Sequence, residues 1–198
     1  MAASEELNLK AQLSLIETMM AEGRRSTESW GWSFLLWGLA YYVATAWSAL
    51  GHSNLAWPVT MISTGVLTGI IGARVSHGHP ETTLGRAIGG VWKAMGVSLF
   101  VVLVALGMSG HYNIHVYMAI IGGMLAIANG TSSLILKWKM QLASALVWLA
   151  AGVAGSFGTD GQALISFLVA VFFCQIVFGA YAMILDSRRN RLQGAVHV

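Results

Sequence analysis

Residues 162–185 read QALISFLVAVFFCQIVFGAYAMIL and contain no Asp, Glu, Lys or Arg. A helix of about 20 apolar residues crosses the hydrocarbon core of a bilayer, so an uncharged run of this length is typical of a transmembrane helix. Five further apolar runs precede it, at about 30–50, 56–74, 88–109, 114–136 and 141–157. The sequence therefore predicts an all-α integral membrane protein in which residues 29–186 form a bundle of six transmembrane helices.

The composition agrees with this fold class and disfavours an ordinary soluble domain. Charged residues make up 10% of the 198 residues and hydrophobic residues 56%, and the mean hydropathy is +0.67. A soluble domain contains about 25% charged residues, so this chain has too few of them to cover a water-soluble surface. The net charge of +3 comes from basic residues beside the apolar runs rather than on one amphipathic surface, and no nucleic-acid partner is expected.

The basic residues predict the orientation of the six helices. All eleven Lys and Arg residues fall before the first span, at or near the turns at 75–87 and 137–140, or from residue 187 to 198 in a basic tail. The other three connections contain none: 51–55, 109–113 and 158–162. Because translocation of Lys and Arg is disfavoured, we expect a multi-pass protein of the cell inner or plasma membrane with both termini in the cytoplasm. A five-helix count is the main alternative, because the run at 141–157 is the shortest, but it would place the basic tail outside.

Residues 1–28 precede the first apolar run and have the pattern of an amphipathic helix. Their apolar side chains include Leu9, Leu13, Ile16 and Met20, spaced i, i+4, i+7 and i+11. This spacing places the four side chains on one stripe of a helix. We expect a cytoplasmic helix whose stripe contacts a protein partner, a second copy of the chain or the inner surface of the bilayer.

A faint internal repeat suggests that the bundle consists of three helical hairpins. Gly51-His52-Ser53-Asn54 follows the first span and resembles Gly110-His111-Tyr112-Asn113 after the third. A Trp-Lys pair opens the second hairpin at 92–93 and the third at 138–139. Gly and Asn suit tight turns in any protein, so chance similarity of turn chemistry is the alternative explanation.

Small residues recur at every fourth position on several spans, as at Gly65 and Gly69 or at Gly122 and Ala126. Helices in lipid associate by close packing, and small side chains let their backbones approach. We expect these stripes to mark contact faces between helices.

A few polar side chains lie inside the predicted spans. They are Ser63, Thr64 and Thr68 on the second span, Asn129, Thr131, Ser132 and Ser133 on the fourth, and Gln175 on the sixth. If these groups face one another, they form a polar path or a binding site for a neutral solute. We favour the other interpretation, in which they form hydrogen bonds between helices or to the backbone of a solid bundle. No Asp or Glu lies within a predicted span, which disfavours proton-coupled carriers and pumps.

Three histidines, His52, His111 and His115, are expected on the outer side, with Asp160 in the remaining outer turn. Such a set can ligate a transition metal, so an outward-facing metal or redox site is one interpretation. However, lone histidines in loops are common, and no cysteine or second carboxylate supports these three. We therefore expect no cofactor, with a transition metal as the exception to test.

No catalytic motif accompanies these features. The sequence contains no Gly-rich phosphate loop, serine-hydrolase elbow or paired carboxylates, so an enzyme is disfavoured. The best interpretation is a non-catalytic accessory or regulatory membrane bundle. A channel or facilitator for an uncharged small solute or ion is the first alternative, and the metal or redox site is the second.

Overall fold

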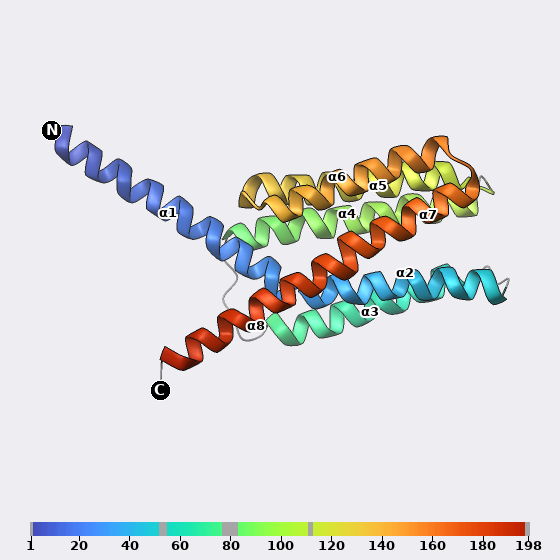
Figure 1. The fold of residues 1–198 in the computed structure, drawn as a ribbon, viewed down its shortest axis with the longest axis horizontal. Coiled ribbons are helices and arrows are strands. Elements are labelled where there is room, and N and C mark those ends of the chain that lie inside the picture. Colours follow the sequence, from blue (N-terminus) through green and yellow to red (C-terminus); the bar gives the residue numbers. More distant parts are fainter. Residues whose placement is uncertain (1, 52–54, 77–82, 111–112, 197–198) are drawn as a thin grey trace.

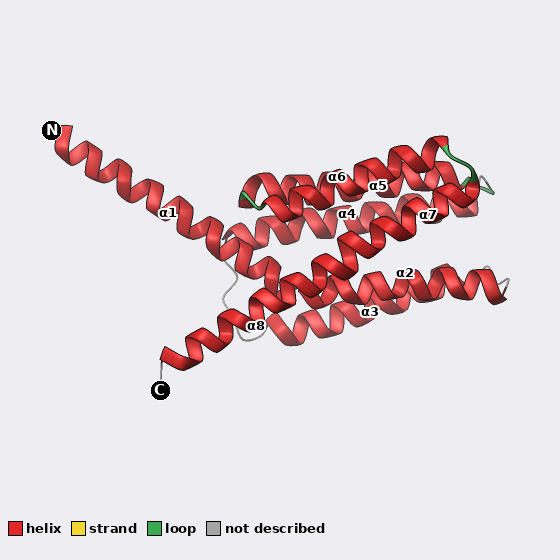
Figure 2. Ribbon diagram, in the orientation of Figure 1, coloured by secondary structure: helices red, strands yellow, loops and turns green. Residues whose placement is uncertain are grey.

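The computed structural model describes residues 2–51, 55–76, 83–110 and 113–196. The described residues are 95% helical, and no strand occurs among them (Figure 2). Six helices are long and apolar enough to cross a membrane, which confirms the predicted all-α class and fits a multi-pass membrane protein.

The helices follow the N-terminal segment and the six apolar runs. Their bounds are α1 Ala2–Ser29, α2 Gly31–Gly51, α3 Ala56–Ser76, α4 Thr83–Met108, α5 Ile114–Leu136, α6 Lys139–Phe157 and α7 Asp160–Val171. The chain then continues without a break through a π-helical segment, η1 (Phe172–Val177), into α8 (Phe178–Val196). The last apolar run is therefore part of one long helix that extends beyond residue 185.

The long helix formed by α7, η1 and α8 runs between two groups of helices (Figure 1). The α2–α3 hairpin packs on one side of it through α2, and α5 and α6 pack on the other. Tyr41 of α2 and Trp148 of α6 both contact Phe167 of α7, with ring centroids 5.5 and 6.2 Å apart. This buried aromatic group holds the two sides of the bundle to the long helix.

The closest helix pair is α5 and α6. A Cβ built on Gly122 would lie 2.6 Å from the Cα atom of Gly152, a distance that no real side chain tolerates. The contact face predicted from small residues is therefore present at Gly122. It is absent at Gly65 and Gly69, where no described residue lies within 4 Å of an added Cβ.

The three predicted hairpins each pack against themselves, because α2 contacts α3, α4 contacts α5, and α6 contacts α7. The tightest pairing, between α5 and α6, nevertheless joins the second hairpin to the third. The similar turns that suggested a repeat lie mostly at 52–54 and 111–112, outside the described residues.

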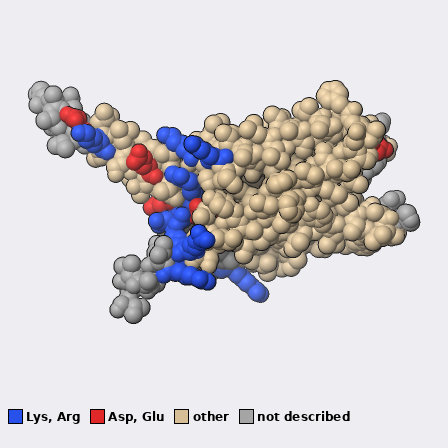
Figure 3. Space-filling model, in the orientation of Figure 1, with Lys and Arg blue, Asp and Glu red and all other residues tan. Residues whose placement is uncertain are grey.

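Lys and Arg side chains gather at one end of the bundle, which we call the basic end (Figure 3), whereas Lys10 lies on α1. It contains the junction of α1 with α2, the start of α4, the α5–α6 turn and the C-terminal part of α8. We call the opposite end, where Asp160 begins α7, the far end. From the basic end, α1 projects away from the bundle (Figure 1).

Candidate functional site

An ion pair joins α1 to α8 at the basic end. The Nη1 atom of Arg189 lies 2.6 Å from the Oε2 atom of Glu28, and the two side chains are 32% and 6% exposed. A carboxylate this deeply buried is costly unless a cation neutralises it. The pair therefore fixes the last turn of α1 against the C-terminal part of the long helix.

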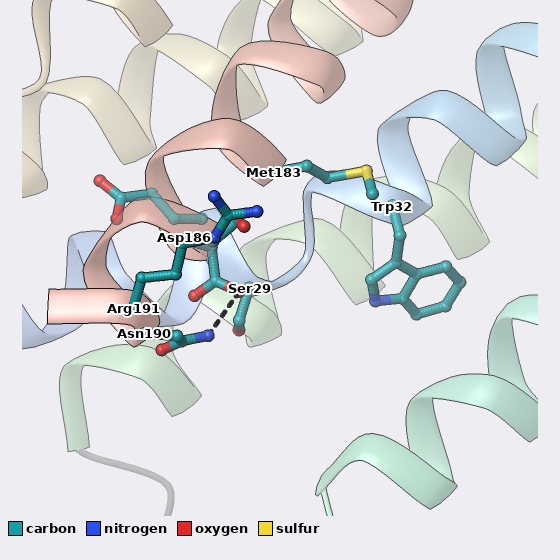
Figure 4. Close-up of a pocket in the computed structure, with 8 residues that line it drawn as sticks. Ser29, Trp32, Met183, Asp186, Asn190 and Arg191 are labelled. Carbon is teal, nitrogen blue, oxygen red and sulfur yellow. Dashed lines mark hydrogen bonds between the residues drawn. The ribbon is translucent and has the colours of Figure 1, made fainter. Parts of the chain in front are cut away.

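Glu28 of this ion pair also lines an open pocket of about 550 Å³, whose lining residues are drawn in Figure 4. Its walls come from the α1–α2 junction and from one face of α8, and its lining residues are Glu28, Ser29, Trp32, Met183, Asp186, Ser187, Asn190 and Arg191. The α8 residues share a face because they recur every three or four positions. Among them, the Asn190 Nδ2 atom donates a hydrogen bond of 3.4 Å to the Asp186 Oδ2 atom.

Two glycines allow the walls of the pocket to approach each other. A Cβ built on Gly31 of α2 would lie 2.9 Å from the carbonyl oxygen of Gly179 in α8, and the reverse construction gives the same distance. Because neither residue has a side chain, the two helix backbones lie in direct contact. This contact brings Trp32 and α8 to the same pocket.

The polar residues predicted on the second span do not join those on the fourth and sixth. Ser63 is exposed, and the hydroxyls of Thr64 and Thr68 donate to the carbonyls of Thr60 and Thr64, one turn back on α3, at 2.7 and 2.8 Å. Within the described ranges, α3 packs against α2 and makes no comparable contact with α5, η1 or α8. These three hydroxyl residues therefore lie apart from Asn129 and Gln175.

On α5, the predicted polar residues serve local and interhelical hydrogen bonds. The buried Asn129 side chain donates to the Leu125 carbonyl at 2.8 Å, and Ser132 accepts a 3.2 Å bond from the indole nitrogen of Trp92 on α4. Ser133 donates to the Trp138 carbonyl in the turn before α6. Thr131 is only half-buried.

Gln175 is buried in η1, where it packs against Gly38 of α2. A Cβ on Gly38 would lie 2.9 Å from the Cβ of Gln175, so α2 approaches the π-helical segment closely. The Oε1 atom of Gln175 has no hydrogen-bond partner in the described part of the chain. Neither Gln175 nor Asn129 lines the pocket at the basic end.

Of the three candidate metal ligands, His52 and His111 lie outside the described residues. Both ring nitrogens of His115 face protein acceptors: Nδ1 lies 2.7 Å from the Gly155 carbonyl and Nε2 lies 3.2 Å from the Asp160 carboxylate. No group of three His, Cys, Asp or Glu side chains suited to a metal occurs in the ranges that the structure covers. In the described residues, His115 instead connects the start of α5 to the end of α6 and the start of α7.

Neither the ion pair nor the pocket was predicted from the sequence. The available signal was the position of Glu28, the carboxylate nearest to the first span, together with the arginines that follow the last span. A helical bundle that brings its first and last spans together at one end places these charges side by side. No protein-family model, curated protein or solved structure matches the chain, so its own geometry is the basis for a functional proposal.

Proposed function

We propose that the protein is a non-catalytic accessory or regulatory subunit of the cell inner or plasma membrane, and that it acts through α1. The observation that carries this proposal is the exposure of apolar side chains along the projecting part of α1. Leu9, Leu13 and Ile16 are 58%, 54% and 52% exposed. We call residues 6–22 the α1 arm, since α1 packs against the bundle from Gly23 onward.

The arm is held rigidly at its base. A Cβ on Gly23 would lie 2.6 Å from the Cδ2 atom of Leu136 at the end of α5, and the Glu28–Arg189 pair follows about one and a half turns later. A helix anchored at two points keeps a constant direction. This favours an arm that presents its stripe at a defined place on the basic end.

We propose that the stripe is covered by a basic groove on a different protein. Residues 1–22 contain four Glu and one Lys, so the formal charge of the segment is −3. Helices that lie on anionic membranes are typically rich in Lys and Arg, and two copies of an acidic arm repel each other. A partner groove with basic edges would bury the leucines and pair with the glutamates.

The bundle interior supports a packed accessory subunit rather than a polar path. Asn129 bonds to its own helix, and Gln175 is pressed against α2. The hydroxyls of Thr64 and Thr68 donate to carbonyls of their own helix, α3. Backbone bonds within a helix and close contacts between helices are what a packed bundle requires.

The proposed orientation places the basic end in the cytoplasm, because Lys and Arg are retained on that side. Reporter fusions test it directly. A reporter fused after Val198 should be active only in its cytoplasmic form, whereas fusions at Asn113 or Asp160 should be active only in the external form. External activity of the C-terminal fusion would overturn the orientation.

Photo-crosslinking in intact cells tests the role of the arm. A photoreactive residue at position 13 or 16 should form an adduct with one other protein, and the same residue at Leu15, which is exposed on another face, should not. Charge reversal by Glu17→Lys should weaken the adduct. An adduct only with a second copy of the chain, or only with lipid, would contradict the proposed partner.

A further inference from the structure

The pocket at the basic end changes from apolar to charged along α8. Met183 and Trp32 line its inner part, and Asn190 and Arg191 lie about two turns farther toward the end of the helix. With a rise of 1.5 Å per residue, residues 183 to 191 cover about 12 Å. In the membrane placement proposed above, on which this inference rests, the inner part meets acyl chains and the outer part meets headgroups.

The charges that remain available in the pocket have opposite signs. The Glu28 carboxylate is engaged by Arg189 at 2.6 Å, which leaves Asp186 and Arg191 as the other charged lining residues. A purely anionic ligand would be repelled by Asp186, and a purely cationic one by Arg191. A zwitterion can satisfy both side chains with charge-assisted hydrogen bonds.

Trp32 adds a hydrogen-bond donor to the inner part of the pocket. Its Nε1 atom is buried and has no acceptor among the residues that the structure describes. In Figure 4 the nitrogen is on the side of the indole ring nearest to Ser29 and Asp186. An indole N–H can only donate, so a ligand that brings an oxygen atom to this level would remove the cost of the missing bond.

We propose that this pocket binds a phospholipid with a zwitterionic aminoethyl phosphate headgroup, a phosphatidylethanolamine. Asp186 accepts hydrogen bonds from the ammonium group, and Arg191 donates to the phosphate. The Trp32 N–H donates to an ester or glycerol oxygen, and the first part of an acyl chain lies against Met183. Because the lining residues come from both sides of the Gly31–Gly179 contact, the lipid links α2 to α8 beside the base of the α1 arm.

Native mass spectrometry of the full-length chain in detergent micelles tests the proposal. The protein is titrated with dioctanoyl phosphatidylethanolamine, phosphatidylglycerol and phosphatidylcholine, and separately with soluble glycerophosphoethanolamine. Phosphatidylethanolamine should bind most tightly, because a choline ammonium has no N–H to donate to Asp186. Tighter binding of phosphatidylglycerol would reveal general attraction to the basic end and overturn the proposal. Equal binding of the soluble compound would exclude a lipid as the preferred ligand.

Three variants locate the site. Asp186→Asn should weaken binding of phosphatidylethanolamine by about tenfold, the effect of one lost charge-assisted hydrogen bond, without weakening that of phosphatidylglycerol. Arg191→Gln should weaken binding of both lipids. Arg188→Gln removes the same charge from the same helix but does not line the pocket, so it should leave binding unchanged. Equal losses in the two arginine variants, or no loss in Asp186→Asn, would place the lipid elsewhere.

Discussion

Removal of the Glu28–Arg189 ion pair should measurably loosen the attachment of α1 to the bundle. The informative perturbation is a double-mutant cycle of Glu28→Gln, Arg189→Gln and the two together. Each single change leaves one partner without its opposite charge, whereas the double variant leaves neither. The coupling energy from the cycle isolates the interaction between the two side chains.

The burial of the pair sets the expected magnitude. Loss of one partner of a fully buried ion pair costs about 3 to 5 kcal/mol, whereas exposed pairs contribute about 0 to 1 kcal/mol. The Glu28 side chain is 6% exposed but the Arg189 side chain is 32% exposed, so water partly screens the interaction. We therefore expect a coupling energy of about 2 kcal/mol, between these two limits.

The chain contains a matched control for this measurement. Lys10 and Glu6 on the α1 arm form an ion pair of 2.7 Å, nearly the same length, but their side chains are 69% and 66% exposed. A cycle of Lys10→Gln and Glu6→Gln should give a coupling of about 0.3 to 0.5 kcal/mol. Both cycles can be measured by unfolding in mixed detergent micelles, followed by circular dichroism. If the coupling of the Glu28–Arg189 pair does not exceed that of the control, burial at the base of α1 does not strengthen the pair.

Three further perturbations test other parts of the bundle. Gly122→Ala should lower the unfolding free energy by about 1 to 3 kcal/mol, because the added methyl group overpacks α5 against α6. Gly123 faces open space, so Gly123→Ala should not lower the unfolding free energy. Equal effects of the two substitutions would contradict the close approach of α5 and α6. Asn129→Cys and Gln175→Cys, each in a chain in which Cys174 is first replaced by Ala, should not react with a membrane-impermeant thiol reagent. Rapid labelling at both positions would favour a polar path. His115→Ala removes contacts to α6 and α7 and should lower the unfolding free energy by about 1 kcal/mol. An unchanged midpoint of unfolding would show that these contacts do not stabilise the far end.

The number and order of the helices could be predicted because hydropathy is a local property. Each apolar run is long enough to identify a helix without reference to any other part of the chain. The ends of helices are harder to predict, because hydropathy changes where a helix becomes polar and not where it ends. This is why α8 continues to Val196 although its apolar residues end near 185, and why α4 begins at Thr83 rather than near 88.

The site was harder to predict because it depends on which helices meet. Gly122 and Gly65 have the same small-residue spacing, yet α6 covers the first and no described residue covers the second. Glu28 and Arg189 lie at opposite ends of the sequence, and neither stands out until α1 and α8 are placed together. A pattern within one helix gives the face that can form a contact, but the partner is decided by competition among all the helices.

The π-helical segment Phe172–Val177 affects where a single residue can be deleted from the long helix without disturbing its contacts. A π-helical turn arises when one extra residue is accommodated within an α-helix, so the flanking α7 and α8 keep the faces that an uninterrupted α-helix one residue shorter would present. Deletion of one residue from this segment should therefore give a regular helix whose Arg189 still points toward Glu28. The same deletion in α8 between η1 and Arg189 would rotate the arginine by about 100° around the helix axis. We expect naturally occurring insertions and deletions in the long helix to concentrate at the π-helical segment.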